Sequence, residues 1–567
     1  KATIPGFKRG YIDVEISGGT NGNSYEYIIP SEANTPNGLT FADIASWTDA
    51  NWKTWKDYNN IPLTEFDKVT ESDKVTYRLK HTKGGNVFAG GMGRLYQLDG
   101  KTPISAVNWW KVGCVKQTKL TVKGGIIKSN VYGGGELGAV KPYVNGTVVQ
   151  GGTTEVIVQN DNTQIGTEVQ DNVIQYTFGS VYGGGYGSTI ENLNGTDDPN
   201  TENDNPKFVA GLVHGNTKID MQGGKVLASI YGGGEVASVN GSAEVAVSGG
   251  EVGKDKVGDK LFGGPTMGNV YGGGSGHPNI VRCGRILKNT KITISGDDTK
   301  IYHNVYGGGA YGTVGEFNYT TGTDGKVNGV TSLKTEGTGT AEVIITGGTI
   351  GTDGHENGMV FGSSRGDVNR PGARDDYTAW VYDAKVTIGT SDKGTTLTTP
   401  LVKGSVYGSG ENGHTFNNTI VNIYSGTVGI TDPEIDGGAR YSYRGNVYGG
   451  GCGTDIYTKD SKRRYNPLAG IVYGTTTVNM TGGHVVHDVF GGGAMGSVGK
   501  FTFDDNGKPT GIVEGAATNS GKCTLNISGG MIGMTGMQTT AEGGPDDFGH
   551  VFGAGRGENC FQPISRW

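Results

Sequence analysis

Residues 217–242 read TKIDMQGGKVLASIYGGGEVASVNGS, and this stretch decides the fold. Apolar and polar residues alternate in its first part, so Ile219 and Met221 share one face of a short strand. After a Gly-Gly pair, Val226 and Ile230 share one face of a second strand, and a glycine triplet then turns the chain into a third, VASV. Three short strands joined by glycine corners have the size of one coil of a parallel β-helix.

The same unit recurs along the whole chain. A Val or Ile followed by an aromatic residue and then by small residues, mostly glycine, occurs 11 times at intervals of 35–62 residues. The aromatic residues are Phe88, Tyr132, Tyr182, Tyr231, Tyr271, Tyr306, Phe361, Tyr407, Tyr448, Phe490 and Phe552. Strands that end in Gly-Gly precede many of them, as at 118–125 and 476–483. A constant core with variable spacing is typical of a structural repeat that carries loops of different length.

We therefore expect an all-β fold. It is predicted to be a right-handed parallel β-helix solenoid of about 11–12 coils, with three short strands per coil and loop insertions. The 106 glycines among 567 residues suit its corners, because glycine accepts positive φ and close backbone approach. A flatter solenoid is the alternative, whereas an antiparallel propeller would need four strands in each blade.

The chain divides into two expected parts. Residues 1–83 form an N-terminal coil with a Trp-rich insertion at about 21–75, and residues 84–567 form the glycine-rich β-helix. Within the insertion, 41–58 (FADIASWTDANWKTWKDY) is the best helix candidate of the chain. Its tryptophans are Trp47, Trp52 and Trp55. We expect this insertion either to cap the open first coil, which solenoids need, or to bind a ligand.

The repeated aromatic residue is the next candidate for function. If Val226 and Ile230 point into the coil, Tyr231 points outward, and its counterparts form a column of rings. The column either stiffens the rod by mutual stacking or offers a platform to sugars or to a partner surface. The candidate ligand-binding residues are Tyr132, Tyr182, Tyr231, Tyr271 and Tyr306, with Trp47, Trp52 and Trp55.

Charge and composition argue against several classes of protein. The 48 Lys and Arg against 55 Asp and Glu give a net charge of −7, which does not favour nucleic-acid binding. No run of 18 apolar residues predicts a transmembrane segment. The five cysteines and nine histidines form no metal-ligand cluster, so we expect no metal site and no cofactor. Acidic loops such as 196–198 leave Ca²⁺ binding open.

Catalysis is not expected. A polysaccharide lyase or glycosidase built on a β-helix needs carboxylates that converge on one face. Among the residues that follow the glycine triplets, Glu136 and Glu235 lie two coils apart with Tyr186 between them. A carbohydrate-active enzyme of this kind nevertheless remains the alternative function.

Several phrases resemble known repeat proteins. GNVYGGGSG at 268–276, SIYGGGEVASV at 229–239 and GSVYGSGENGH at 404–414 resemble the large glycine-rich VYGGG-repeat surface proteins of Bacteroidota. The resemblance implies a secreted or cell-surface protein on the outer surface of a Gram-negative bacterium, with an adhesin-like or stalk role. Its partners would be a glycan or a host or bacterial surface protein. Alternatively, the chain is a subunit of a larger outer-membrane assembly or abuts further repeats, since it looks like a mature piece or a fragment of a longer protein.

Overall fold

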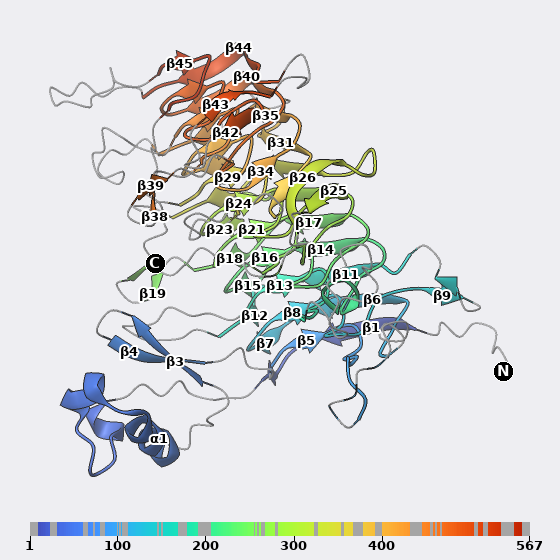
Figure 1. Cartoon of the computed structure of the whole chain (residues 1–567), viewed down its shortest axis with the longest axis vertical. Helices are drawn as coiled ribbons and strands as arrows, with labels where there is room; N and C mark the ends of the chain where they lie inside the picture. The colour runs from blue at the N-terminus through green and yellow to red at the C-terminus, as the bar shows by residue number, and fades with distance from the viewer. Residues whose placement is uncertain are drawn as a thin grey trace.

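The structure is a computed structural model of the 567-residue chain. It describes residues 10–22, 31–59, 66–71, 74–79, 85–98, 100, 102, 104, 112–144, 147–148, 151–167, 179–190, 206–254, 256–257, 260–261, 267–277, 280, 282–321, 327–352, 357–366, 378–391, 400–430, 445–453, 457–459, 462–464, 468–503, 509–513, 520–534 and 549–557. Two large sheets of 20 and 11 strands pair in parallel and form an all-β parallel β-helix (Figure 1).

The first ladder of the β-helix holds the longest strands. They are β1 (Tyr11–Ile16), β6 (Gln117–Val122), β11 (Thr154–Val158), β14 (Thr217–Met221), β17 (Ala243–Val247), β22 (Thr290–Ile294), β27 (Thr340–Ile345), β31 (Asp383–Ile388), β35 (Thr419–Ile423), β40 (Thr476–Val485) and β44 (Cys523–Ile532). Each pairs in parallel with the equivalent strand of the next coil. Gly224, in the Gly-Gly pair that follows β14, has a φ of 83°, which explains why a corner needs glycine there.

Two ladders of very short strands complete most of the coil. The second ladder is β2 (Thr20–Asn21), β7 (Gly125–Ile127), β12 (Thr163–Ile165), β15 (Lys225–Val226), β18 (Glu251–Val252), β23 (Lys300–Ile301), β28 (Thr349–Ile350), β32 (Leu401–Val402), β36 (Thr427–Val428) and the ends of β40 and β44. The third holds the repeated aromatic residues: β5 (Val87–Phe88), β8 (Val131–Tyr132), β13 (Val181–Tyr182), β16 (Ile230–Tyr231), β21 (Val270–Tyr271), β24 (Val305–Tyr306), β29 (Val360–Phe361), β33 (Val406–Tyr407), β37 (Val447–Tyr448), β41 (Val489–Phe490) and β45 (Val551–Phe552).

The internal division of the coil differs from the prediction. The expected second strand splits into β15 and β16, because the chain bends between Val226 and Ile230. The expected third strand shrinks to a single parallel bridge at Val239, which pairs with Val213 on one side and Ile286 on the other. Most described coils therefore carry three short strands and one bridge, and the described part of the aromatic ladder spans 11 coils.

The main core runs along the axis between these ladders. It contains fully buried Val, Ile, Leu and Met side chains. The first ladder contributes two positions in each coil, such as Ile219 and Met221, and the other two ladders contribute one each, such as Val226 and Ile230. Threonine at the start of a long strand crosses this core to the aromatic ladder: the Thr217 hydroxyl donates to the Gly232 carbonyl at 2.6 Å. The same bond forms at Thr118, Thr154, Thr290, Thr419 and Thr476. This bond satisfies a buried hydroxyl and ties two walls of one coil together.

A ladder of side chains, polar except for Met359, links successive coils beside the aromatic strands. Each side chain up to Asp488 accepts the backbone N–H of its counterpart in the next coil, as when Asn269 Oδ1 accepts from Asn304 N at 3.0 Å. The positions are Asn86, Asn130, Ser180, Ser229, Asn269, Asn304, Met359, Ser405, Asn446, Asp488 and His550. Coils are thus joined by side chains as well as by the sheet ladders.

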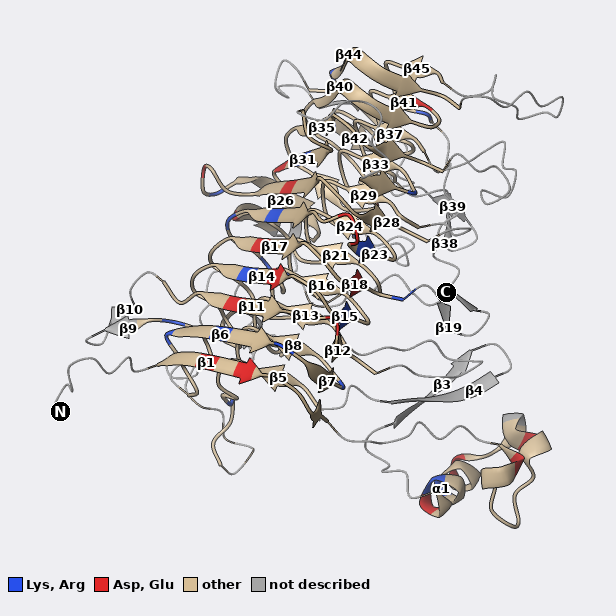
Figure 2. Ribbon diagram, turned by 180° about the vertical axis from the view of Figure 1, so that it is seen from behind, with Lys and Arg blue, Asp and Glu red and all other residues tan. Residues whose placement is uncertain are grey.

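The outer face of the first ladder carries a column of charges, visible as alternating red and blue segments in Figure 2. Register pairs the residues of successive coils in the order Asp13, Lys119, Glu155, Lys218, Glu244, Lys291, Glu342 and Lys385. We call these eight residues the charge column. Opposite charges always face each other across adjacent strands, which favours this register and disfavours a slip of one coil.

Within the part of the chain that the structure describes, six antiparallel hairpins project from the coils as insertions. They are β3 (Phe66–Glu71) with β4 (Lys74–Leu79), β9 (Tyr143–Val144) with β10 (Thr147–Val148), β19 (Lys256–Val257) with β20 (Lys260–Leu261), β25 (Phe317–Thr321) with β26 (Val327–Leu333), β38 (Tyr457–Lys459) with β39 (Lys462–Arg464), and β42 (Phe501–Phe503) with β43 (Pro509–Ile512). One further parallel pair joins β30 (Trp380–Val381) to β34 (His414–Thr415).

Helices are few, as the sequence predicts. Those on described residues are η1 (Glu32–Asn34), η2 (Phe41–Ser46), α1 (Asp49–Tyr58) and α3 (Pro206–Val209). The expected helix at 41–58 is broken by Trp47 and Thr48, and Thr48 caps α1 by accepting a hydrogen bond from Asn51 N. None of the described helices is long and apolar enough to span a membrane.

Candidate binding surface

The repeated aromatic residues form one continuous stack. Adjacent ring centroids from Phe88 to Phe552 are 4.6–4.9 Å apart and the rings are inclined by only 5–14°. This separation equals the spacing of hydrogen-bonded strands, because each coil contributes one ring at the same position. Mutual stacking, one of the two predicted uses of the column, is therefore confirmed.

The expected accessible platform is not found. Tyr231 lies on the opposite side of its strand from Ile230, as predicted, yet it belongs to a second buried cluster beyond the aromatic ladder. The five tyrosines proposed as ligand-binding residues, Tyr132, Tyr182, Tyr231, Tyr271 and Tyr306, are at most 6% exposed. Alanine and cysteine side chains of the corners, such as Ala310 and Cys452, pack in this cluster, so the column is a second core.

The tryptophans of the N-terminal insertion are buried as well. Trp47 packs edge-on against Trp52 at 4.8 Å, and Trp52 packs against Trp55 at 5.8 Å. The Trp55 indole N–H donates to Asn34 Oδ1 at 3.1 Å, which links α1 to η1. These three residues build a small local core and offer no exposed ring face. Figures 1 and 2 draw α1 to one side of β1 and β5, so the capping role stays a prediction.

Charged side chains are buried beside the aromatic column. Arg365 and Glu411, which follow the corners of two successive coils, are 1% and 4% exposed. The Tyr306 hydroxyl donates to Glu411 Oε2 at 2.6 Å, and Arg365 Nη1 donates to the Tyr311 hydroxyl at 3.5 Å. Burial raises the pKa of Glu411, although Arg365 and the Tyr306 hydroxyl act against this shift.

A histidine in the same buried region is neutral at ordinary pH. His303 Nδ1 lies 2.6 Å from Asn269 Oδ1, so this nitrogen carries the donated proton. Burial, and then the positive charge of Arg365, lower the pKa of His303 to about 3. A histidine held neutral in this way serves the polar ladder between coils and is poorly suited to general acid–base chemistry near pH 7.

A different set of aromatic residues does reach the surface. Tyr382, Phe416 and Tyr473 lie on three successive coils, each just after a residue of the bridge ladder, and all three are half-buried. Their centroids are 6.0 Å apart between Tyr382 and Phe416 and 5.6 Å between Phe416 and Tyr473. We call these three residues the aromatic patch. Trp380 is fully buried beneath it and contacts both Phe416 and Tyr473.

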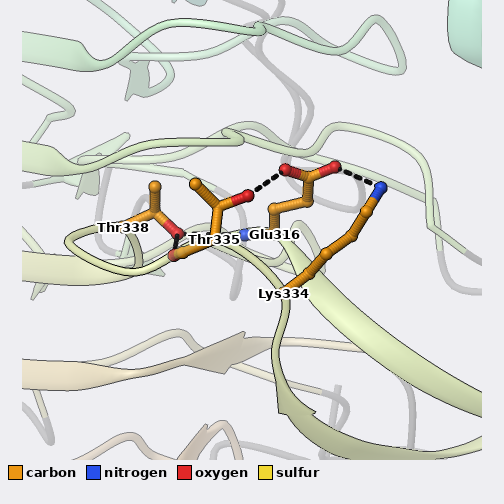
Figure 3. Close-up of polar contacts among 4 residues, drawn as sticks. All are labelled: Glu316, Lys334, Thr335 and Thr338. Carbon is orange, nitrogen blue, oxygen red and sulfur yellow. Dashed lines mark hydrogen bonds and ion pairs between the residues drawn. The ribbon is translucent and has the colours of Figure 1, made fainter.

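The β25–β26 hairpin borders the aromatic patch. Its residues Phe317, Tyr319 and Leu333 pack in the same cluster as Trp380. The base of the hairpin is fixed by Glu316, which accepts from Lys334 Nζ at 2.7 Å and from the Thr335 hydroxyl at 2.6 Å (Figure 3). Below it, the Thr338 hydroxyl donates to the Thr335 carbonyl at 2.7 Å. These bonds give the patch a fixed wall.

Polar and charged groups surround the same rings. Lys500 Nζ lies 5.9 Å from the Phe416 centroid and 5.3 Å from that of Tyr473, within cation–π range. Asp383 Oδ1 accepts from Asn417 Nδ2 at 2.9 Å and from Asn418 N at 3.0 Å, and burial raises the pKa of Asp383. Aromatic faces with adjacent polar groups can hold a ligand that has both an apolar face and hydroxyl groups.

The sequence contains a pattern that marks the aromatic patch, but it lies away from the glycine triplets. In 381–382, 415–416 and 472–473, a β-branched residue precedes an aromatic one shortly before a long strand. Within the described chain, the residues that follow the other bridges are not aromatic: they are Lys116, Lys141, His214, Asn240, Leu287, Gly315 and Gly499.

Among the described residues, no group of three or more His, Cys, Asp or Glu side chains is arranged to hold a metal ion. The acidic loop at 196–198, considered for Ca²⁺, lies outside the described residues. Comparison with known proteins adds nothing to this geometry: no family model, curated protein or solved structure matches the chain.

Proposed function

We propose that the chain is a non-enzymatic, cell-surface β-helix that acts as an adhesin-like stalk and binds glycans through the aromatic patch. Three ladders of side chains support the stalk: the stacked rings, the polar ladder from Asn86 to His550, and the threonine bonds across the core. All of them connect one coil to the next or one wall to another. The resemblance to VYGGG-repeat surface proteins supports a location outside the cell.

The observation that carries glycan binding is the half-buried aromatic patch itself. Pyranose rings have an apolar C–H face that packs on an aromatic ring, and hydroxyl groups at their edges that need polar partners. Phe416 and Tyr473 are held from below by Trp380, so their ring positions are set before any ligand arrives. Such preorganisation lowers the entropic cost of binding.

Binding is tested with the purified chain on an array of bacterial, plant and host glycans. The double variant Tyr382→Ala/Tyr473→Ala is expected to lose most of the signal on any glycan that the wild type retains, about tenfold or more in affinity. Tyr58→Ala, which removes an aromatic side chain that is 60% exposed and far along the chain, is the control. Equal binding by the double variant would contradict the role of the patch.

The same glycans test the absence of catalysis. Incubation with the chain should release no new reducing ends and no unsaturated uronides over a day. Depolymerisation of any glycan would favour the alternative, a carbohydrate-active β-helix enzyme. If the double variant Tyr382→Ala/Tyr473→Ala still depolymerised a glycan, the active site would lie outside the aromatic patch.

A further inference from the structure

The aromatic patch lies between two hairpins that begin alike but differ in charge. A bridge residue and a glycine precede each hairpin, at 314–315 before β25 and at 498–499 before β42. Backbone hydrogen bonds and bridges place the three coils of the patch between these two positions. The residue that follows the glycine is Glu316 at the first hairpin and Lys500 at the second. Equivalent positions at the two ends of the patch therefore carry opposite charges.

Only one of these two charges is neutralised by a neighbouring side chain. Glu316 forms an ion pair with Lys334 Nζ at 2.7 Å (Figure 3). Lys500 forms no ion pair within the described part of the chain, and its Nζ lies 5.9 Å from the Phe416 centroid and 5.3 Å from the Tyr473 centroid. Lys500 therefore gives this end of the patch a positive charge that no described carboxylate neutralises.

The opposite end of the patch carries negative charge. Asp383 comes directly after Tyr382, and Glu336 is an exposed residue just beyond β26. Burial, and then the charges of Asp383 and Glu336, raise the pKa of Tyr382, so both carboxylates act on this ring. Asp383 is held in place, because its Oδ1 accepts from Asn417 Nδ2 at 2.9 Å and from Asn418 N at 3.0 Å. A negatively charged ligand group is therefore disfavoured at this end of the patch and favoured at the other.

The backbone of Lys500 is anchored, while its side chain keeps rotatable bonds. Lys500 N donates to Ser520 Oγ at 3.2 Å, and this hydroxyl donates to the Tyr473 carbonyl at 2.6 Å. Val513 N donates to the Lys500 carbonyl at 3.1 Å, which closes the base of the β42–β43 hairpin. The ammonium group at the end of a flexible four-carbon stem can turn from the rings to a ligand without movement of the hairpin.

We propose that the aromatic patch selects acidic oligosaccharides, with a sugar carboxylate paired to Lys500 Nζ and the sugar rings against the neighbouring aromatic residues. The inference rests on the proposed glycan binding and adds the class of glycan and its direction. Opposite charges at the two ends of the patch give the ligand one direction along the rod, with the acidic sugar at the end of Tyr473. A charge-assisted contact of this kind contributes specificity in addition to the contact area of the rings.

The test compares matched ligands that differ only in charge. The probes are oligogalacturonate, oligoglucuronate and sialyllactose, each beside its methyl ester, which keeps the sugar rings and removes the negative charge. In isothermal titration calorimetry the wild type should bind at least one acid about tenfold or more tightly than its ester. Added NaCl should reduce this preference, because salt screens a contact at the surface.

Three variants locate the charge that reads the ligand, and circular dichroism checks the fold of each. Lys500→Met keeps the apolar stem and should bind acid and ester equally, whereas Lys500→Arg should retain the preference. Glu336→Gln is the matched control, because it removes an exposed charge of opposite sign at the other end of the patch. This variant should bind the acids at least as tightly as the wild type.

The outcomes separate this inference from glycan binding itself. A wild type that binds neutral glycans, or acids and esters equally, would overturn the acidic preference and leave the proposed function standing. A preference that survives Lys500→Met would also overturn it, because the carboxylate would then pair elsewhere. If the wild type binds none of these probes and no glycan on the array, both the inference and the proposed function fail.

Discussion

The aromatic column and the charge column run along the same rod with one side chain in each coil. Both have the spacing of parallel strands, and both place residues that attract each other in adjacent coils. Yet Tyr271 is fully buried, whereas Glu244 in the same coil faces solvent. Regular spacing therefore determines which side chains meet, whereas burial determines how much each contact contributes to the free energy of unfolding.

The largest expected effect comes from breaking the aromatic column at its middle. Tyr271→Ala removes a ring that stacks on Tyr231 at 4.7 Å and on Tyr306 at 4.9 Å, and leaves a cavity in the second core. We expect the free energy of unfolding to fall by about 3–5 kcal/mol, measured by urea denaturation. Glu244→Ala, in the charge column of the same coil, should change it by at most about 0.5 kcal/mol. Similar losses in the two variants would contradict the comparison.

The polar neighbours of the buried column give the next effect, a dependence on pH. The folded-state pKa of His303 is about 3 and lies below its ordinary value of 6.5, so the unfolded chain takes up the proton first on acidification. The contribution of neutral His303 to the free energy of unfolding is therefore fully present above pH 6.5 and is lost as the pH falls toward 3. Within this window, each pH unit of acidification should lower the free energy of unfolding by about 1.4 kcal/mol.

Denaturation midpoints between pH 7 and pH 4 measure this effect. His303→Gln keeps a donor for Asn269 but cannot take up a proton, so its stability should fall less steeply over the same range. Parallel curves for wild type and His303→Gln would show that the buried histidine is not the titrating group.

The two columns also differ in how far the sequence could predict them. The glycine corners and the alternation at 217–221 are local properties, so the coil, its aromatic residue and the stacking of rings were predictable. The burial of Tyr306 was not, because its partner Glu411 lies 105 residues away and meets it only once the coils are stacked. The charge column was hidden for the same reason: Glu155 and Lys218 are neighbours only in the final register.

The aromatic patch needed the structure for another reason. Tyr382 follows the two-residue strand β30 and Tyr473 follows a bridge of a single residue, and such short elements leave almost no periodic signal in the sequence. Local alternation therefore predicts what each coil looks like, while contacts between coils decide which of its surfaces stay available.

The smallest expected effect comes from the charge column. Glu155 lies between two lysines, 3.9 Å from Lys119 Nζ and 3.5 Å from Lys218 Nζ, and about a third of its side chain is exposed. Because water and salt screen such pairs, Glu155→Gln should lower the free energy of unfolding by only about 0.2–1 kcal/mol. The loss should shrink further in 1 M NaCl, where the screening length is about 3 Å. A salt-independent loss above about 2 kcal/mol would mean that the charge column carries weight comparable to the buried rings, and the distinction between the two columns would fail.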